Sequence, residues 1–165
     1  MKSAIDIGKW FVSQKLDTPQ NTLDGNIKLQ KLLFFAQLIH LKRNNTLLFE
    51  ECFLAFTNGP VVESVRLSYK ENYDLFGTEC VYDDTELESL ILTNEIFGDS
   101  EAIELVEISH HSPAWRKYYE KSIQGNYHDK CLSLIPYSDF QKEMEMIDNV
   151  LFAHEYQKEG VKSDF

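Results

Sequence analysis

The segment at residues 26–43 constrains the fold of this chain more than any other part. It has no glycine or proline, and apolar residues cover most of the helix circumference that it would form. Asn26 can cap its start, and a helix of this length spans roughly 25 Å, enough to cross a small domain. The pattern predicts a central hydrophobic helix. Four basic residues are expected on its one narrow solvent-exposed side: Lys28, Lys31, Lys42 and Arg43.

Two glutamines, Gln30 and Gln37, lie on the apolar side of this predicted helix, seven residues apart and therefore on one stripe. A buried amide without hydrogen-bond partners costs about 1–3 kcal/mol. We expect both side chains to bind loop backbone and to hold the segment around residues 58–60. The alternative is that they meet the backbone of a partner protein.

The remaining pattern is typical of a mainly α, compact single-domain fold around this central helix. Helical spacing of apolar residues appears at residues 3–15, at 85–97, between Ser100 and His111, and after Ser138, where Ser138 and Gln141 form a capping-box pattern. The last helix carries an apolar stripe that consists of Tyr137, Phe140, Met144, Ile147, Leu151 and His154. This stripe favours packing against the core, and an interface with a second copy or a partner is the alternative.

A short β-hairpin is the expected exception to this helical pattern. Residues 52–57 are apolar and aromatic, as in a strand, and residues 79–84 are expected to return as a second strand. Asn58-Gly59-Pro60 is expected to form a turn. Pro60 is then expected to begin a helix at its first position, where its missing N–H does no harm, with Val61, Val65 and Tyr69 on one face.

The chain length of 165 residues indicates one domain, expected at residues 1–160, with a loose tail at 161–165. No apolar run is long enough to span a membrane. The first residues lack the apolar core of a signal peptide. These patterns predict a cytoplasmic protein with no membrane association.

The three cysteines, Cys52, Cys80 and Cys131, are widely spaced. An odd number without a Cys-x-x-Cys pair argues against both a disulfide framework and a zinc site. Free cysteines are usually buried, so we expect three reduced thiols.

The net charge of −11 comes from one region of the sequence. From residue 71 to residue 115 there are 12 acidic residues and no lysine or arginine, whereas the rest of the chain is nearly balanced. Such a region repels nucleic-acid phosphates and attracts basic partners, so we expect no direct nucleic-acid binding. The alternative is that this acidic region is a solvent-exposed surface that binds no partner. Four residues represent the expected acidic face: Asp83, Asp84, Glu86 and Glu88.

Motifs for catalysis or cofactor binding are not apparent. The chain has no G-x-G-x-x-G, no Walker A sequence and no Gly-x-Ser-x-Gly. His110-His111 lacks metal-ligand spacing, and no cysteine lies in a context that would activate it. We therefore expect a protein that is not an enzyme and that needs no metal or cofactor.

Three ordered segments give a resemblance to a known family. The first is the helix Leu29-Gln30-Lys31-Leu32-Leu33-Phe34-Phe35-Ala36-Gln37, the second is Asn58-Gly59-Pro60-Val61 followed by Tyr69, and the third is Ser109-His110 followed by Pro113-Ala114-Trp115. In order and spacing they resemble the SocA-like antitoxin family, or Panacea domain. The similarity extends from about Trp10 to the helix after Pro136. The family usually has its proline and tryptophan adjacent, whereas Ala114 separates them here.

The resemblance implies an antitoxin that neutralises a cognate toxin encoded by a neighbouring gene, by direct contact or by presenting it to a protease or chaperone. It also implies the partner-binding or motif residues: Gln30, Phe34, Gln37, Asn58, Gly59, Pro60, Val61, Tyr69, His110 and Trp115. A homodimer is left open. A second hypothesis is a phage- or plasmid-borne acidic inhibitor that mimics nucleic acid and binds a nucleic-acid-binding protein.

Overall fold

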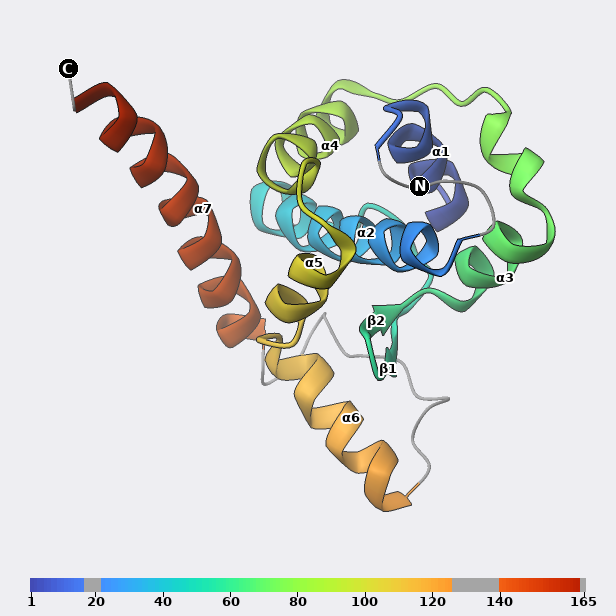
Figure 1. Ribbon diagram of the computed structural model, residues 1–165. Helices are drawn as coiled ribbons and strands as arrows, with labels where there is room; N and C mark the ends of the chain where they lie inside the picture. Colours follow the sequence, from blue (N-terminus) through green and yellow to red (C-terminus); the bar gives the residue numbers. More distant parts are fainter. Residues whose placement is uncertain (17–21, 126–139, 164–165) are drawn as a thin grey trace.

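The computed structural model describes residues 1–16, 22–125 and 140–163. They form a mainly α-helical protein with one small hairpin, which confirms the predicted fold class (Figure 1). In chain order the elements are α1 (Ala4–Ser13), α2 (Leu23–Asn44), β1 (Leu54–Phe56), β2 (Gly59–Val61), α3 (Glu63–Glu71), the 3-10 helix η1 (Tyr73–Gly77), α4 (Asp84–Phe97), α5 (Ala102–Ser109), α6 (Pro113–Gly125) and α7 (Phe140–Ser163).

Helix α2 lies at the centre of the fold, with α1, α3, α4, α5 and α7 packed around it (Figure 1). It begins slightly before the predicted start because Thr22, rather than Asn26, is its N-cap: Thr22 Oγ1 accepts a hydrogen bond of 3.1 Å from the Gly25 N–H. It ends at Asn45, whose left-handed backbone closes the last turn. The prediction of a central helix is confirmed.

The core lies where the neighbouring helices cover α2. Phe35 of α2 stacks on Phe97 of α4 at a ring-centroid distance of 4.2 Å. Ile7 and Phe11 of α1 are completely buried. The core around α2 is thus built largely from aromatic and branched side chains, which bury the most apolar surface per residue.

The hairpin differs from its predicted form. Its strands are β1 and β2, which pair antiparallel with Leu54 opposite Val61 and Phe56 opposite Gly59. The predicted second strand at residues 79–84 is wrong: residues 79–83 have no regular secondary structure, and Asp84 begins α4. This segment is tied to α1 through a side chain, since the Tyr82 hydroxyl donates to the Asp6 carbonyl at 2.5 Å.

The predicted helix start at Pro60 is also wrong. Pro60 lies inside β2 opposite Ala55, and α3 begins three residues later, at Glu63. A proline fits here because an edge strand of a two-stranded hairpin does not need every N–H. The expected apolar face of the helix is present in α3, where Val65 and Tyr69 are buried.

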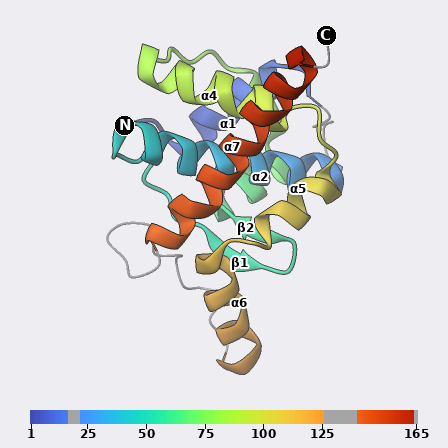
Figure 2. The same ribbon diagram turned by 90° about the vertical axis from the view of Figure 1, so that its left-hand side faces the viewer.

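The last two helices complete the structure. Helix α6 was not predicted, although Ser112-Pro113 is a common helix start. Helix α7 crosses in front of α2 in Figure 2, and Lys42 forms an ion pair of 2.5 Å with Asp148 across this contact. Buried Met144 and Ile147 confirm that the described part of the predicted stripe packs against the core.

Some expectations for the end of the chain lie outside the described residues, among them the roles of Tyr137 and Ser138. Helix α7 extends to Ser163, so it includes part of the expected tail. The division into a domain at residues 1–160 and a tail stays a prediction.

The cysteine prediction is wrong in one respect. Cys80 is a free, partly buried thiol, but Cys52 is disulfide-bonded, and Cys131 lies outside the described residues. An odd number of cysteines argues against a framework of disulfides but not against a single one. Among the described helices, none is both long and apolar enough to cross a membrane.

Candidate functional site

The tip of the hairpin is held tightly between α2 and α5. Gly59 has a backbone φ of +105°, which favours glycine, and a Cβ added there would lie 2.4 Å from Ser109 Oγ and 2.8 Å from Lys31 Cε. Only a residue without a side chain therefore fits. The close approach brings together one residue from each of the three sequence segments that carry the family resemblance.

Lys31 lies under the hairpin, completely buried, and its Nζ donates to the Pro60 carbonyl at 2.7 Å. Its predicted position on a solvent-exposed side is wrong. Burial lowers the pKa of Lys31 to about 7, because the charged form loses its hydration. The lysine thus acts as a structural donor to a backbone carbonyl of β2.

Lys28 departs from the prediction in the same way. It is buried, and its Nζ donates to the Gly98 carbonyl at the end of α4 at 2.8 Å. Lys42 and Arg43 are exposed as predicted. The helix is surrounded on all sides from Lys28 to Leu41, so a long side chain there must find a carbonyl acceptor inside the protein.

Gln30 and Gln37 are both buried and bind loop backbone, as predicted. Gln30 forms a two-bond pair with Val62, whose N–H donates to Oε1 at 2.8 Å and whose carbonyl accepts from Nε2 at 3.3 Å. Gln37 binds elsewhere: its Oε1 accepts from the Leu48 N–H at 2.7 Å and its Nε2 donates to the Phe49 carbonyl at 2.8 Å. Gln30 therefore holds the hairpin, and Gln37 holds the segment before it.

Trp115 and His110 bind the backbone of the hairpin on its other side. Trp115 Nε1 donates to the Phe56 carbonyl at 2.8 Å, and His110 Nε2 lies 3.1 Å from the Thr57 carbonyl. The two rings stack with centroids 4.2 Å apart and planes within 9°. Trp115 is buried, whereas His110 is partly exposed. Burial lowers the pKa of His110, which favours the neutral ring.

A polar contact with α7 fixes the start of α6 and hence Trp115. Glu143 is buried, and its Oε1 accepts from the Ser112 hydroxyl at 2.7 Å and from the Ala114 N–H at 2.5 Å. Ser112 Oγ in turn accepts from the Trp115 N–H at 3.1 Å. Ser112 and Glu143 were not among the predicted site residues. The Ser-Pro pair could have indicated the helix start, but nothing local indicates its partner on α7.

A pocket of about 250 Å³ opens beside the hairpin, between the first turns of α2 and α3. Three of its lining residues were predicted as motif residues, namely Gln30, Asn58 and Val61. The complete lining consists of Leu23, Asn26, Ile27, Gln30, Lys31, Phe56, Thr57, Asn58, Val61 and Arg66.

The other seven predicted motif residues do not line this pocket, and two of them, Phe34 and Tyr69, lie in the core. Phe34 is completely buried and packs edge-on against Phe53 at 5.2 Å, so it belongs to the core. Tyr69 is buried on α3, in an aromatic cluster with Tyr73 and Phe76. Desolvation raises the pKa of Tyr69 above its ordinary value.

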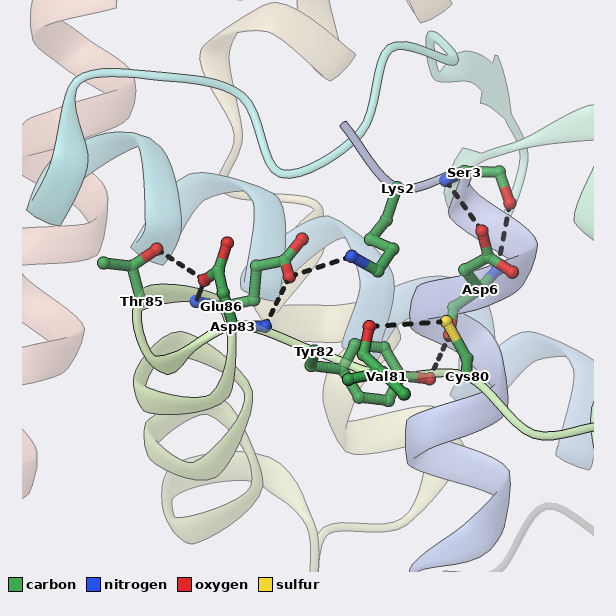
Figure 3. A network of polar contacts seen from close by, with 9 residues as sticks. All are labelled: Lys2, Ser3, Asp6, Cys80, Val81, Tyr82, Asp83, Thr85 and Glu86. Carbon is green, nitrogen blue, oxygen red and sulfur yellow. Dashed lines mark hydrogen bonds and ion pairs between the residues drawn. The ribbon is translucent and has the colours of Figure 1, made fainter.

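The acidic face differs from its expected composition at Glu86, which is buried (Figure 3). Glu86 Oε1 accepts from the Asp83 N–H at 2.8 Å and from Lys2 Nζ at 3.2 Å, and Asp83 accepts from the Glu86 N–H as the N-cap of α4. This capping box is typical of a helix start. Glu86 is therefore structural, and its hydrogen bond raises the pKa of Lys2.

The other acidic residues of this region are exposed. Glu88 forms an exposed ion pair of 3.2 Å with Arg43. The complete exposed set is Glu71, Asp74, Glu79, Asp83, Asp84, Glu88, Glu95, Asp99, Glu101, Glu104 and Glu107. Most of these residues lie on α4 and α5 or beside them. The excess of acidic residues in this part of the sequence is therefore exposed on these two helices. In the described part of the chain, no group of three or more histidine, cysteine or carboxylate residues is placed to hold a metal ion.

Comparison with known proteins gave one finding. A family model described as "Antitoxin SocA-like, Panacea domain" matches residues 29–116, slightly more than half of the chain. The match begins in α2, includes the hairpin, α3, α4 and α5, and ends just after Trp115. Searches among curated proteins and solved structures found no match.

Proposed function

This chain belongs to the family of SocA-like antitoxins with a Panacea domain, and we propose that it neutralises a cognate toxin by direct protein–protein binding. One observation carries the proposal. Within the matched residues, the three segments that carry the resemblance meet at the hairpin, where Lys31 and Trp115 bind its backbone and Ser109 lies against Gly59. We infer that this hairpin and its pocket form the surface that the toxin contacts.

The mechanism that we propose is occlusion by a preorganised surface. The hairpin is short, but its backbone is fixed by buried donors from α2 and α6: Lys31 binds Pro60, Gln30 binds Val62 and Trp115 binds Phe56. A rigid surface loses little conformational entropy when it binds, which favours affinity. Delivery of the bound toxin to a protease or chaperone is a further step that the same complex could support.

The exposed acidic surface of α4 and α5 supports a basic toxin. Eight exposed carboxylates lie on or beside α4 and α5, one of them paired with Arg43, and they create a negative field, which speeds the encounter with a positively charged partner. The same observation favours the second candidate function, an acidic inhibitor that mimics nucleic acid. The two candidates differ in their target: a neighbouring toxin in the first, a nucleic-acid-binding protein in the second.

We further propose that the protein is a binding protein and not an enzyme. The polar side chains around the hairpin are engaged with backbone: Lys31 with Pro60, Ser109 with the Val106 carbonyl, and His110 with Thr57. None of these three is paired with another as a nucleophile and its base would be.

Co-expression with the adjacent gene tests the proposal. The neighbour is induced alone and together with this chain, growth is scored, and the complex is purified through a tag on the neighbour. We expect the neighbour to stop growth alone, and this chain to restore growth and to co-purify. A neighbour that is harmless, or that is toxic but neither bound nor neutralised, would refute the antitoxin proposal and favour the acidic inhibitor.

A further inference from the structure

The pocket beside the hairpin has the size and walls of a site for one large side chain. Its volume of about 250 Å³ accommodates one large side chain, and an adjoining cavity of about 490 Å³ shares Leu23, Asn26 and Arg66 with it. Leu23, Ile27, Phe56 and Val61 supply apolar walls. Leu23 stands at the rim with 74% of its surface exposed, so a bound side chain would also cover an exposed apolar residue.

Asn26, which also lines the pocket, has an unsatisfied acceptor. Its Nδ2 donates to the Arg66 carbonyl at 3.3 Å, but its buried Oδ1 has no hydrogen-bond partner in the structure. The amide cannot simply be reversed, because Oδ1 would then face the Arg66 carbonyl oxygen. A buried acceptor without a donor is unfavourable, so this atom would gain from a donor brought by a ligand.

The charges around the pocket argue against an ionic ligand. The Arg66 guanidinium is already paired with Glu63, with Nε 3.0 Å from Oε2 and a second contact from Nη2 to Oε1, and it lies over the Phe56 ring at 5.5 Å. A carboxylate would find no free guanidinium there, Lys31 Nζ is already bound to the Pro60 carbonyl, and the unpaired Asn26 Oδ1 would repel it. A cation would meet the Arg66 guanidinium, which also lines the pocket.

A neutral ligand with an apolar body and one donor fits all of these features. We propose that the pocket binds a tyrosine or tryptophan side chain of the toxin, whose O–H or indole N–H donates to Asn26 Oδ1 after a small rotation of the Asn26 amide. This inference rests on the proposed function. Tyrosine and tryptophan are also the aromatic residues that most often anchor protein interfaces.

Amino-acid amides serve as probes because they need no knowledge of the toxin. N-acetyl-tryptophan amide, its indole-N-methylated analogue, N-acetyl-phenylalanine amide and N-acetyl-arginine amide are titrated while NMR follows the methyl and side-chain amide signals of Asn26, Ile27 and Val61. We expect the tryptophan amide to shift these signals and to bind about fivefold more tightly than the methylated analogue, which is the effect of one hydrogen bond. Arginine amide is expected to bind most weakly.

Two variants separate the donor effect from simple apolar binding. Asn26→Leu keeps a side chain of similar size but removes the acceptor, so the preference for tryptophan amide over its methylated analogue should disappear. Asn149→Leu, at an exposed position on α7, is the matched control and should keep the full preference. The melting temperature of each variant shows that it is folded.

The outcomes distinguish this inference from the proposed function. Shifts outside the pocket, equal affinity for the methylated analogue, or a preference for arginine amide would each contradict the pocket assignment. If the chain neutralises its neighbour but shows one of these results, only the pocket assignment fails. If the donor preference is found but no neighbouring toxin is neutralised, the pocket chemistry is supported and the antitoxin proposal fails.

Discussion

The ammonium nitrogen of Lys31 lies 2.7 Å from the carbonyl oxygen of Pro60, although the whole lysine side chain is buried. The bond joins the middle of α2 to β2, directly beneath Gly59. A lysine in this position stabilises the hairpin as a donor but is costly as a cation. Its protonation is therefore linked to folding.

The first prediction is a pH dependence of stability. The folded-state pKa of Lys31 of about 7 lies below the ordinary value of 10.5, so between these values the unfolded chain binds a proton that the folded chain lacks. The contribution of Lys31 to the free energy of unfolding should therefore rise with pH across this window, by at most about 1.4 kcal/mol per pH unit, and stay low below it. Urea unfolding at several pH values measures this slope.

Lys31→Met separates this effect from other titrating groups. The variant should show a flatter pH dependence than the parent chain within the same window. Lys70→Met, which changes an exposed lysine, should leave the slope unchanged. Equal slopes for the parent chain and Lys31→Met would mean that Lys31 does not lose its proton in the folded state.

The second prediction concerns Gly59. Gly59→Ala should lower the free energy of unfolding by at least about 2 kcal/mol, because the new Cβ meets Ser109 and Lys31 and the backbone φ disfavours alanine. Adding Ser109→Ala should restore part of the loss, since it removes the nearest clash but not the backbone strain. Gly77→Ala, with nothing within 4 Å of its added Cβ, is the control and should be nearly neutral. Thermal unfolding of all four proteins tests this directly.

The third prediction compares two substitutions of Gln37. Both Gln37→Leu and Gln37→Ala remove the bonds to Leu48 and Phe49, but alanine also leaves a cavity. Gln37→Ala should therefore be less stable than Gln37→Leu by about 1 kcal/mol or more, measured by urea unfolding. Gln141→Ala, at an exposed position of α7, should cost little. An inverted order of the two Gln37 variants would contradict the role assigned to packing.

The fourth prediction concerns Trp115. Trp115→Phe keeps a ring against His110 but loses the bond to the Phe56 carbonyl, so it should cost about 1 kcal/mol of stability. Trp115→Ala removes both and should cost about 3–5 kcal/mol, which weakens the toxin complex indirectly. Melting temperature and co-purification are measured together. An unchanged melting temperature in Trp115→Ala would show that this residue does not hold the hairpin.

The fifth prediction concerns the acidic surface and applies if the toxin is basic. Four exposed carboxylates that accept no hydrogen bond described above are the best positions to neutralise: Glu95, Asp99, Glu104 and Glu107. Their amide variant should associate more slowly and with a flatter salt dependence, because exposed charges act mainly on the association rate. The dissociation rate should change much less, as measured by biolayer interferometry at two salt concentrations.

The variant Glu86→Gln is the matched control for this experiment. Glu86 is buried and binds Lys2 and the Asp83 N–H, so its substitution should lower stability and leave the association rate unchanged. A similar effect of both variants on association would argue against electrostatic steering by the exposed surface.

The sequence alone determined the central helix, the mainly α class and the burial of Gln30 and Gln37. These features depend on the periodicity of apolar residues along a single segment, which is a local property. The order of the three segments that resemble the family likewise indicated that residues near Gly59 and Trp115 share a role. The spacing of these segments in the sequence did not predict that they meet at the hairpin.

Only the tertiary structure decided which polar residues of α2 are buried. Lys28 and Lys31 were predicted on a solvent-exposed side because lysine is usually exposed, but α2 is covered on every side from Lys28 to Leu41. Gly98 and Pro60 supply carbonyl acceptors from distant segments. The same reason explains Glu86, whose partner Lys2 is far away in the chain. Local pattern sets the direction of a side chain along a helix, whereas its partner and its burial depend on which other elements pack there.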